Sequence, residues 1–83
     1  FTPEKWARTP DHMRHKLMWS FHRQYQLEGM TRKEVEKLLG KGDDLQGSVE
    51  YKLADDWIGG WRVYHIDYKQ KRVIRAKETW QDW

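Results

Sequence analysis

The segment with the clearest structural signals is residues 27–40, which read LEGMTRKEVEKLLG. Thr31 and Glu34 are spaced as a capping box, in which the threonine hydroxyl accepts the amide of the glutamate and the carboxylate accepts the amide of the threonine. Gly40 follows the last apolar residue and is typical of a left-handed stop at the end of a helix. These signals predict a short helix between Thr31 and Gly40 that is stable only when it is packed.

A longer amphipathic helix is expected before this segment. Residues 10–27 contain no Gly or Pro after Pro10, and their apolar side chains recur at helical spacing. At about 100° per residue these side chains fall on one face of a helix. Residues 1–9 are expected to form an extended N-terminal arm. The apolar stripe consists of Met13, Leu17, Met18, Phe21 and Tyr25.

After residue 42 the hydrophobic period changes from that of a helix to that of a strand. Apolar and charged residues alternate over residues 49–53, and a second alternating run covers residues 61–68. A turn at residues 69–70 leads into a third strand over residues 71–80. Short connections imply an antiparallel meander. The expected fold class is therefore α+β, a single domain over residues 1–83 with two N-terminal helices packed on one face of a three-stranded antiparallel meander (ααβββ).

The 27–40 segment resembles the motif L-x-G-M-T/S-x-x-E-V-x-x-L-L-G-x-P-D of BamE/SmpA-like domains, which are small bacterial envelope domains that share their fold with each repeat of the beta-lactamase inhibitor proteins. Residues 51–53, 61–67 and 71–73 are similar to the three strands of the family, and the opening of the chain is similar to a subgroup of uncharacterised bacterial proteins. Gly42 departs from the family pattern, which usually has proline there. The resemblance implies an extracytoplasmic, lipoprotein-like scaffold or protein-binding module with no catalytic residues and no cofactor.

Composition narrows the chemistry that the chain can perform. Its 83 residues carry a net charge of +3, 35% of them are charged, and none is cysteine. Disulfides, cysteine-ligated zinc and thiol nucleophiles are therefore excluded. No run of about 20 apolar residues is present, so no membrane span is expected in this segment. Because the chain begins at Phe1 and not at Met, we expect it to be a processed or excised segment.

Six tryptophans are the most informative feature of the composition. We expect three of them, Trp6, Trp57 and Trp61, to close the edges of a small core. The remaining three exceed what such a core needs, and exposed tryptophans are typical anchors of protein interfaces. The expected partner is another protein, and the chain is expected to be a monomer or a weak homodimer. The expected contact residues are Trp19, Trp80 and Trp83, with His65 and Arg75 from the uncovered face of the sheet.

Three other interpretations stay open at this stage. His12, His15 and His22 lie on one side of the first helix, but without cysteine a metal site is disfavoured. The cations of residues 69–77, with Tyr68 beside them, suggest a nucleic-acid-binding hairpin, although the small net charge disfavours it. A protein inhibitor that inserts the loop of residues 57–60 into an enzyme is the third possibility.

Overall fold

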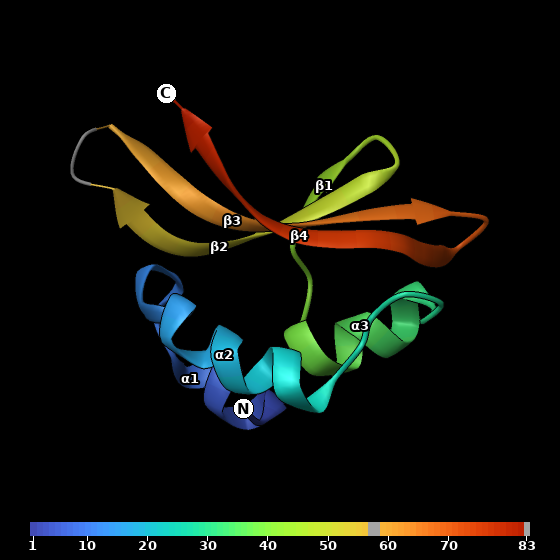
Figure 1. Cartoon of the computed structure of the whole chain (residues 1–83), viewed down its shortest axis with the longest axis horizontal. Helices are drawn as coiled ribbons and strands as arrows, with labels where there is room; N and C mark the ends of the chain where they lie inside the picture. Colours follow the sequence, from blue (N-terminus) through green and yellow to red (C-terminus); the bar gives the residue numbers. More distant parts are fainter. Residues whose placement is uncertain (57–58, 83) are drawn as a thin grey trace.

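The computed structural model describes residues 1–56 and 59–82, apart from the side chains of residues 56 and 82. Over these residues, helices come first and an antiparallel sheet follows, so the expected α+β class is confirmed. The helices lie together on one face of the sheet (Figure 1). The helical elements are α1 (Pro3–Arg8), the 3-10 turn η1 (Asp11–Met13), α2 (His15–Gln24) and α3 (Arg32–Leu39). The strands are β1 (Asp43–Leu45), β2 (Ser48–Asp56), β3 (Gly60–Lys69) and β4 (Arg72–Asp82).

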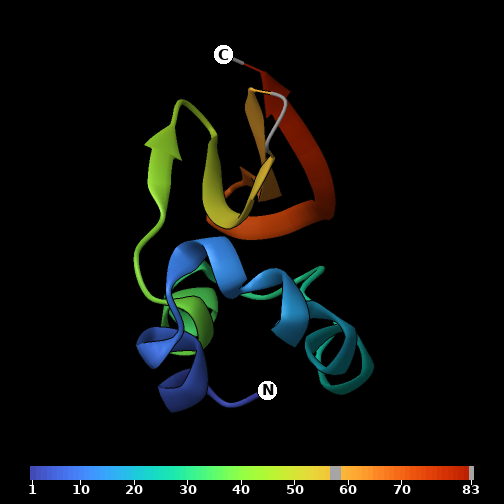
Figure 2. The same cartoon turned by 90° about the vertical axis from the view of Figure 1, so that its left-hand side faces the viewer.

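The sheet has the strand order β1-β2-β3-β4, so each strand pairs with its neighbours in sequence. It curls strongly, and its outer side faces away from the helices (Figure 2). The segment before α3 covers the first part of the outer edge of β4. The amide of Gly29 donates to the carbonyl of Val73, and the amide of Val73 donates to the carbonyl of Met30. Only the later part of β4 therefore presents a strand edge that this segment leaves uncovered.

The signals read from residues 27–40 are confirmed in α3. Glu34 N donates to Thr31 Oγ1 at 3.2 Å, and Thr31 N donates to Glu34 Oε1 at 2.9 Å, which completes the capping box. The hydrogen bonds that the amide and the hydroxyl of Thr31 donate to the Glu34 carboxylate hold the pKa of Glu34 below its ordinary value. Gly40 ends the helix with a φ of +71°, in the region that favours glycine.

Two expectations for the N-terminal part were wrong. Residues 1–9 are not an extended arm, because α1 forms there with Pro3 in its first turn and the Thr2 side chain accepting the Lys5 amide. The long helix expected over residues 10–27 is also broken. η1 and α2 are separate, and the chain is extended at Tyr25.

The physical reason for the break lies at Arg14. Its Nε donates to the carbonyls of Trp6 and Thr9, each at 3.1 Å, and this ties the η1–α2 junction to α1. Such contacts depend on tertiary packing and leave no mark in the periodicity of the sequence.

The sheet differs from the expected meander by one strand and by the position of one turn. β1 is an additional strand, whose three exposed residues pair with the start of β2. A strand of that length with no buried side chain has no alternating pattern to detect. The turn between β3 and β4 falls at Gln70 and Lys71, one residue later than expected, and both residues have positive φ.

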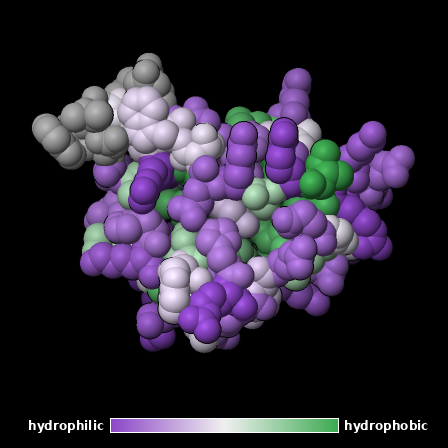
Figure 3. Space-filling view, viewed as in Figure 1, coloured by the Kyte–Doolittle hydropathy of each residue, from purple (hydrophilic) through white to green (hydrophobic). Residues whose placement is uncertain are grey.

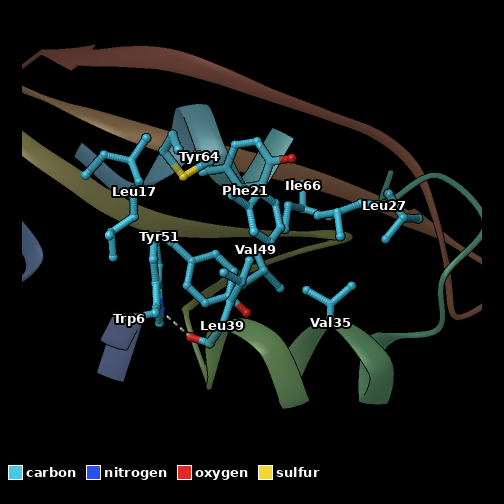
Figure 4. Close-up of a cluster of buried hydrophobic side chains, with 13 residues drawn as sticks. Trp6, Leu17, Phe21, Leu27, Val35, Leu39, Val49, Tyr51, Tyr64 and Ile66 are labelled. Atoms are coloured by element: carbon cyan, nitrogen blue, oxygen red, sulfur yellow. Dashed lines mark hydrogen bonds between the residues drawn. The ribbon is translucent and has the colours of Figure 1, made fainter. Parts of the chain in front are cut away.

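The core lies between the helices and the sheet (Figure 4). Trp6 is its largest member and is 1% exposed, with Nε1 donating to the carbonyl of Leu39 at 2.8 Å. Its ring also contacts Tyr51 and lies under the guanidinium of Arg14. The fully buried aliphatic and aromatic side chains around it come from every layer, among them Phe21, Leu27, Val35, Val49, Leu53 and Ile66.

Candidate functional site

Among the residues that the structure describes, two tryptophans are exposed, and a contact between α2 and β4 links the elements that carry them. Trp19 is 70% exposed and Trp80 is 44% exposed. His22 Nε2 and Glu78 Oε2 lie 2.9 Å apart and join the two elements. Trp19 lies one helical turn before His22, and Trp80 lies two residues after Glu78 on the same face of β4. Each tryptophan is therefore close in sequence to one side of this contact.

Each of these tryptophans is held by its surroundings. The guanidinium carbon of Arg23 lies 4.7 Å from the centroid of the Trp19 ring, a cation–π contact one turn further along α2. The ring of Trp80 lies directly over Gly60 on β3, where a Cβ atom would clash with the ring and with the carbonyl of Gln81. We call the region formed by Trp19, His22, Arg23, Glu78 and Trp80 the Trp19–Trp80 surface.

A second group of polar residues lies on the sheet face that the helices leave uncovered. His65 is central, with Glu50 opposite it on β2 and Asp67 two residues further along β3. Arg75 Nε donates to Asp67 Oδ2 at 3.0 Å, and Gln81 Nε2 donates to Glu50 Oε2 at 2.8 Å. We call these five residues the His65 cluster.

The geometry of the His65 cluster determines the protonation of its histidine. His65 Nδ1 lies 2.7 Å from Glu50 Oε2, and Nε2 lies 2.9 Å from Asp67 Oδ1. Both carboxylates only accept hydrogen bonds, so both ring nitrogens donate in the charged imidazolium form. The hydrogen bond to Glu50, followed by the one to Asp67, raises the pKa of His65. Neither nitrogen is left to take up a proton from a substrate, so His65 is not placed to act as a general base.

Asp67 shows the complementary effect. The hydrogen bond from Arg75, with a smaller contribution from His65, lowers the pKa of the Asp67 carboxyl below its ordinary value.

The surface depression beside the His65 cluster has a volume of about 240 Å³. That volume is below the range of about 300–1,000 Å³ that is usual for small-molecule sites. The His65 cluster therefore has the character of a rigid polar surface more than that of a pocket.

We expect the His65 cluster to make folding stability depend on pH. Because the folded-state pKa of His65 lies above its ordinary value of 6.5, the stabilisation is complete below pH 6.5 and is lost as the pH rises through the folded value. His65→Gln should lower the free energy of unfolding by about 1–3 kcal/mol below pH 6.5 and by less at alkaline pH. Urea denaturation across this range measures the difference. His12→Gln, at an exposed histidine, is the control, and an equal pH slope in wild type and H65Q would contradict the prediction.

The five residues expected to contact a partner do not form one site. Trp19 and Trp80 are exposed, as expected of tryptophans that the core does not need, and the His22–Glu78 contact joins the elements that carry them. His65 and Arg75 are joined through Asp67 on the opposite face of the sheet. Trp83 lies outside the described residues, as do residues 57 and 58 of the 57–60 loop considered for enzyme inhibition.

The residues of the two alternative sites, the helix histidines and the hairpin cations, also have separate partners in the structure. His15 Nδ1 lies 3.3 Å from the carbonyl of Leu53, whereas His22 contacts Glu78 and His12 is exposed. Within the described part of the chain, no group of three or more His, Cys, Asp or Glu residues is arranged to hold a metal ion. Two hairpin cations are engaged elsewhere: Arg72 Nη1 donates to the carbonyl of Gly29, and Arg75 binds Asp67.

Glu50, Asp67 and Gln81 are the residues that sequence reasoning missed in the His65 cluster. Asp67 could have been found, because residues two apart on a strand share a face. Glu50 required the register between β2 and β3, which pairs it with His65 and depends on the bulge near Lys52 and Ala54. A pattern in one strand does not specify that register.

Comparison of the chain with family models, curated proteins and solved structures found no match. Among the residues described, no helix is both long enough and apolar enough to cross a membrane.

Proposed function

We propose that the protein is a non-catalytic interaction module that binds another protein through the Trp19–Trp80 surface. The observation that supports this most directly is the exposure of two tryptophans on elements that the His22–Glu78 hydrogen bond joins. Tryptophan and arginine are the residue types that most often carry the binding energy of protein interfaces. Placement in a bacterial cell envelope is part of the proposal and is supported by the resemblance of residues 27–40 to the BamE/SmpA-like motif.

Pre-organisation also favours this surface as the contact region. Trp19 is stacked with Arg23. The ring of Trp80 packs against Gly60 and occupies the space that a side chain at position 60 would need. A side chain that is already fixed loses little conformational entropy when a partner covers it. The face of the molecule seen in Figure 3 is largely hydrophilic, with hydrophobic residues in small separate groups. Trp19 and Trp80 are the largest of the exposed hydrophobic side chains in the described part of the chain.

The test begins with identification of the partner by photo-crosslinking in cells from position 16, an exposed lysine one turn before Trp19 on α2, so that Trp19 itself is kept. Binding is then measured with the purified partner by isothermal titration calorimetry. Trp19→Ala and Trp80→Ala should each raise Kd by about 30-fold, equivalent to about 2 kcal/mol. Ile74→Ala, which removes an exposed apolar side chain elsewhere on β4, should change Kd by less than about threefold.

Three outcomes would contradict the proposal. One is a crosslinked protein whose affinity is unchanged in both tryptophan variants. Another is Ile74→Ala having the same effect as the tryptophan variants. The third is recovery of nucleic acid that dissociates steeply with salt, since that dependence is the signature of phosphate binding by cations. In that case the basic β3–β4 hairpin would be the functional surface.

A further inference from the structure

A cleft of about 960 Å³ opens between α3, the segment leading into β1, and the tip of the β3–β4 hairpin. These elements meet at the end of the molecule where the β3–β4 hairpin turns (Figure 1). Its volume lies at the upper end of the range of about 300–1,000 Å³ that is usual for small-molecule sites. The residues that line it are Thr31, Arg32, Lys33, Glu36, Lys41, Gly42, Asp44, Tyr68 and Lys71.

The charges in this cleft do not balance. Arg32 is engaged by both acids, with Nη2 3.1 Å from Asp44 Oδ2 and Nε 3.4 Å from Glu36 Oε2. The three lysines of the lining, Lys33, Lys41 and Lys71, form no ion pair with any residue that the structure describes. Four cations against two acids leave a surplus of two positive charges, which matches a ligand that carries two negative charges.

Tyr68 supplies the second observation. Its hydroxyl oxygen is buried and has no hydrogen-bond partner among the described residues. A buried polar atom without a partner destabilises a fold, and native proteins contain few of them. The phenol ring lies under Arg32, whose guanidinium carbon is 5.7 Å from the ring centroid. A phenylalanine at this position would keep the ring and avoid the unpaired hydroxyl, so the hydroxyl has no structural justification in the unliganded protein.

The backbone conformation of Lys71 is also unfavourable for a residue with a side chain. It occupies the turn between β3 and β4 with a φ of +67°, a conformation that glycine adopts far more readily than lysine. Turns of this kind favour Asn-Gly, and this turn has Gln70 and Lys71 instead. A residue held in a strained conformation points to a use for its side chain. Here the side chain contributes one of the unpaired ammonium groups of the cleft.

We propose that this cleft binds a small organic dianion, with its carboxylate or phosphate groups among Lys33, Lys41 and Lys71 and a polar atom hydrogen-bonded to the Tyr68 hydroxyl. The ligand neutralises the surplus charge and pairs the hydroxyl. The cleft lies at the other end of the sheet from the Trp19–Trp80 surface, and the proposal is independent of the protein-binding function.

Calorimetric titration of the full chain at low salt tests the proposal. The probes are succinate as a dicarboxylate, a sugar phosphate as a phosphate monoester, and inorganic phosphate. We expect one organic probe to bind with a submillimolar Kd, and the tighter of the two identifies the anionic group. The double variant K33A/K71A should raise that Kd by at least about tenfold. The control K5A/K77A removes the same charge from exposed positions outside the cleft and should change Kd by less than about twofold.

Tyr68→Phe gives a readout that a merely structural tyrosine would not give. Removal of the unpaired hydroxyl should raise the melting temperature of the free protein by a few degrees and should weaken binding of the organic probe by about threefold or more. A lower melting temperature would show that the hydroxyl has a structural partner and would overturn the proposal. The proposal would also be overturned by the absence of binding at millimolar probe, by equal effects of the two double variants, or by inorganic phosphate binding as tightly as both organic probes.

Discussion

Trp6→Ala is expected to lower the free energy of unfolding by about 3–5 kcal/mol, the range for loss of a large buried aromatic side chain. Trp6 is almost fully buried, and its removal leaves a cavity at the junction of α1, α3 and the sheet. The carbonyl of Leu39 also loses the indole donor. A chain of this length has a total stability of roughly 4–12 kcal/mol, so the loss amounts to about a quarter of the total or more. Urea denaturation followed by circular dichroism measures the change.

Trp19→Ala is the matched control for Trp6→Ala, because the same side chain is removed from a site that is 70% exposed. Its effect on stability should be within about 0.5 kcal/mol of zero. Trp6→Phe should fall between the two variants, since it keeps a smaller aromatic ring and loses the hydrogen bond to Leu39 and part of the buried ring. Equal losses for Trp6→Ala and Trp19→Ala would mean that the exposed and buried tryptophans have been assigned incorrectly.

Gly42→Ala is expected to have the second-largest effect, a loss of about 2–3 kcal/mol. A Cβ atom on Gly42 would lie 2.6 Å from the carbonyl oxygen of Glu50 and 2.7 Å from Cγ1 of Val49. Neither atom can move easily, because one belongs to the backbone of the central strand β2 and the other to a fully buried side chain. The ring of Tyr51, whose hydroxyl donates to the carbonyl of Gly40, would also be displaced.

Lys41→Ala, at the exposed residue before Gly42, separates a steric effect from a general sensitivity of this segment. We expect it to change the free energy of unfolding by no more than about 0.5 kcal/mol. Thermal denaturation of both variants compares them directly. A Gly42→Ala protein as stable as wild type would contradict the prediction. It would show that β2 can shift to accept the methyl group at no cost in the free energy of unfolding.

The parts of the fold that were predicted correctly are those in which local chemistry and tertiary structure agree. The capping box of Thr31 and Glu34 and the stop at Gly40 work through hydrogen bonds and backbone angles that these residues set by themselves. The alternation over residues 49–53 reports burial on one side of a strand. α1 was missed because a helix of this length is unstable alone and forms here around Trp6, whose burial is a property of the whole fold.

The candidate functional residues also fall into those that local sequence predicts and those that depend on tertiary structure. The exposure of Trp19 could be predicted, because it lies opposite the apolar stripe of its helix. The pairing of His65 with Glu50, and the meeting of Lys33 with Lys71 in one cleft, join segments that no local pattern connects. They depend on strand register and on where α3 packs, and both are set by the combined packing of many side chains.

The order of the strands has a consequence for the rate at which the chain folds. Each strand pairs with its sequence neighbour, so the sheet can grow hairpin by hairpin, and a single hairpin forms in about 1–10 μs. Contacts that close long loops occur both in the helical layer and in the sheet: Trp6 to Leu39 spans 33 residues, Glu50 to Gln81 spans 31, and His22 to Glu78 spans 56. Docking of the helices on the sheet, which closes the longest of these loops, is the expected slow step. Pairing of sequence neighbours in the sheet predicts folding faster than that of β-sandwich proteins of similar size, whose strand pairs are more distant in sequence.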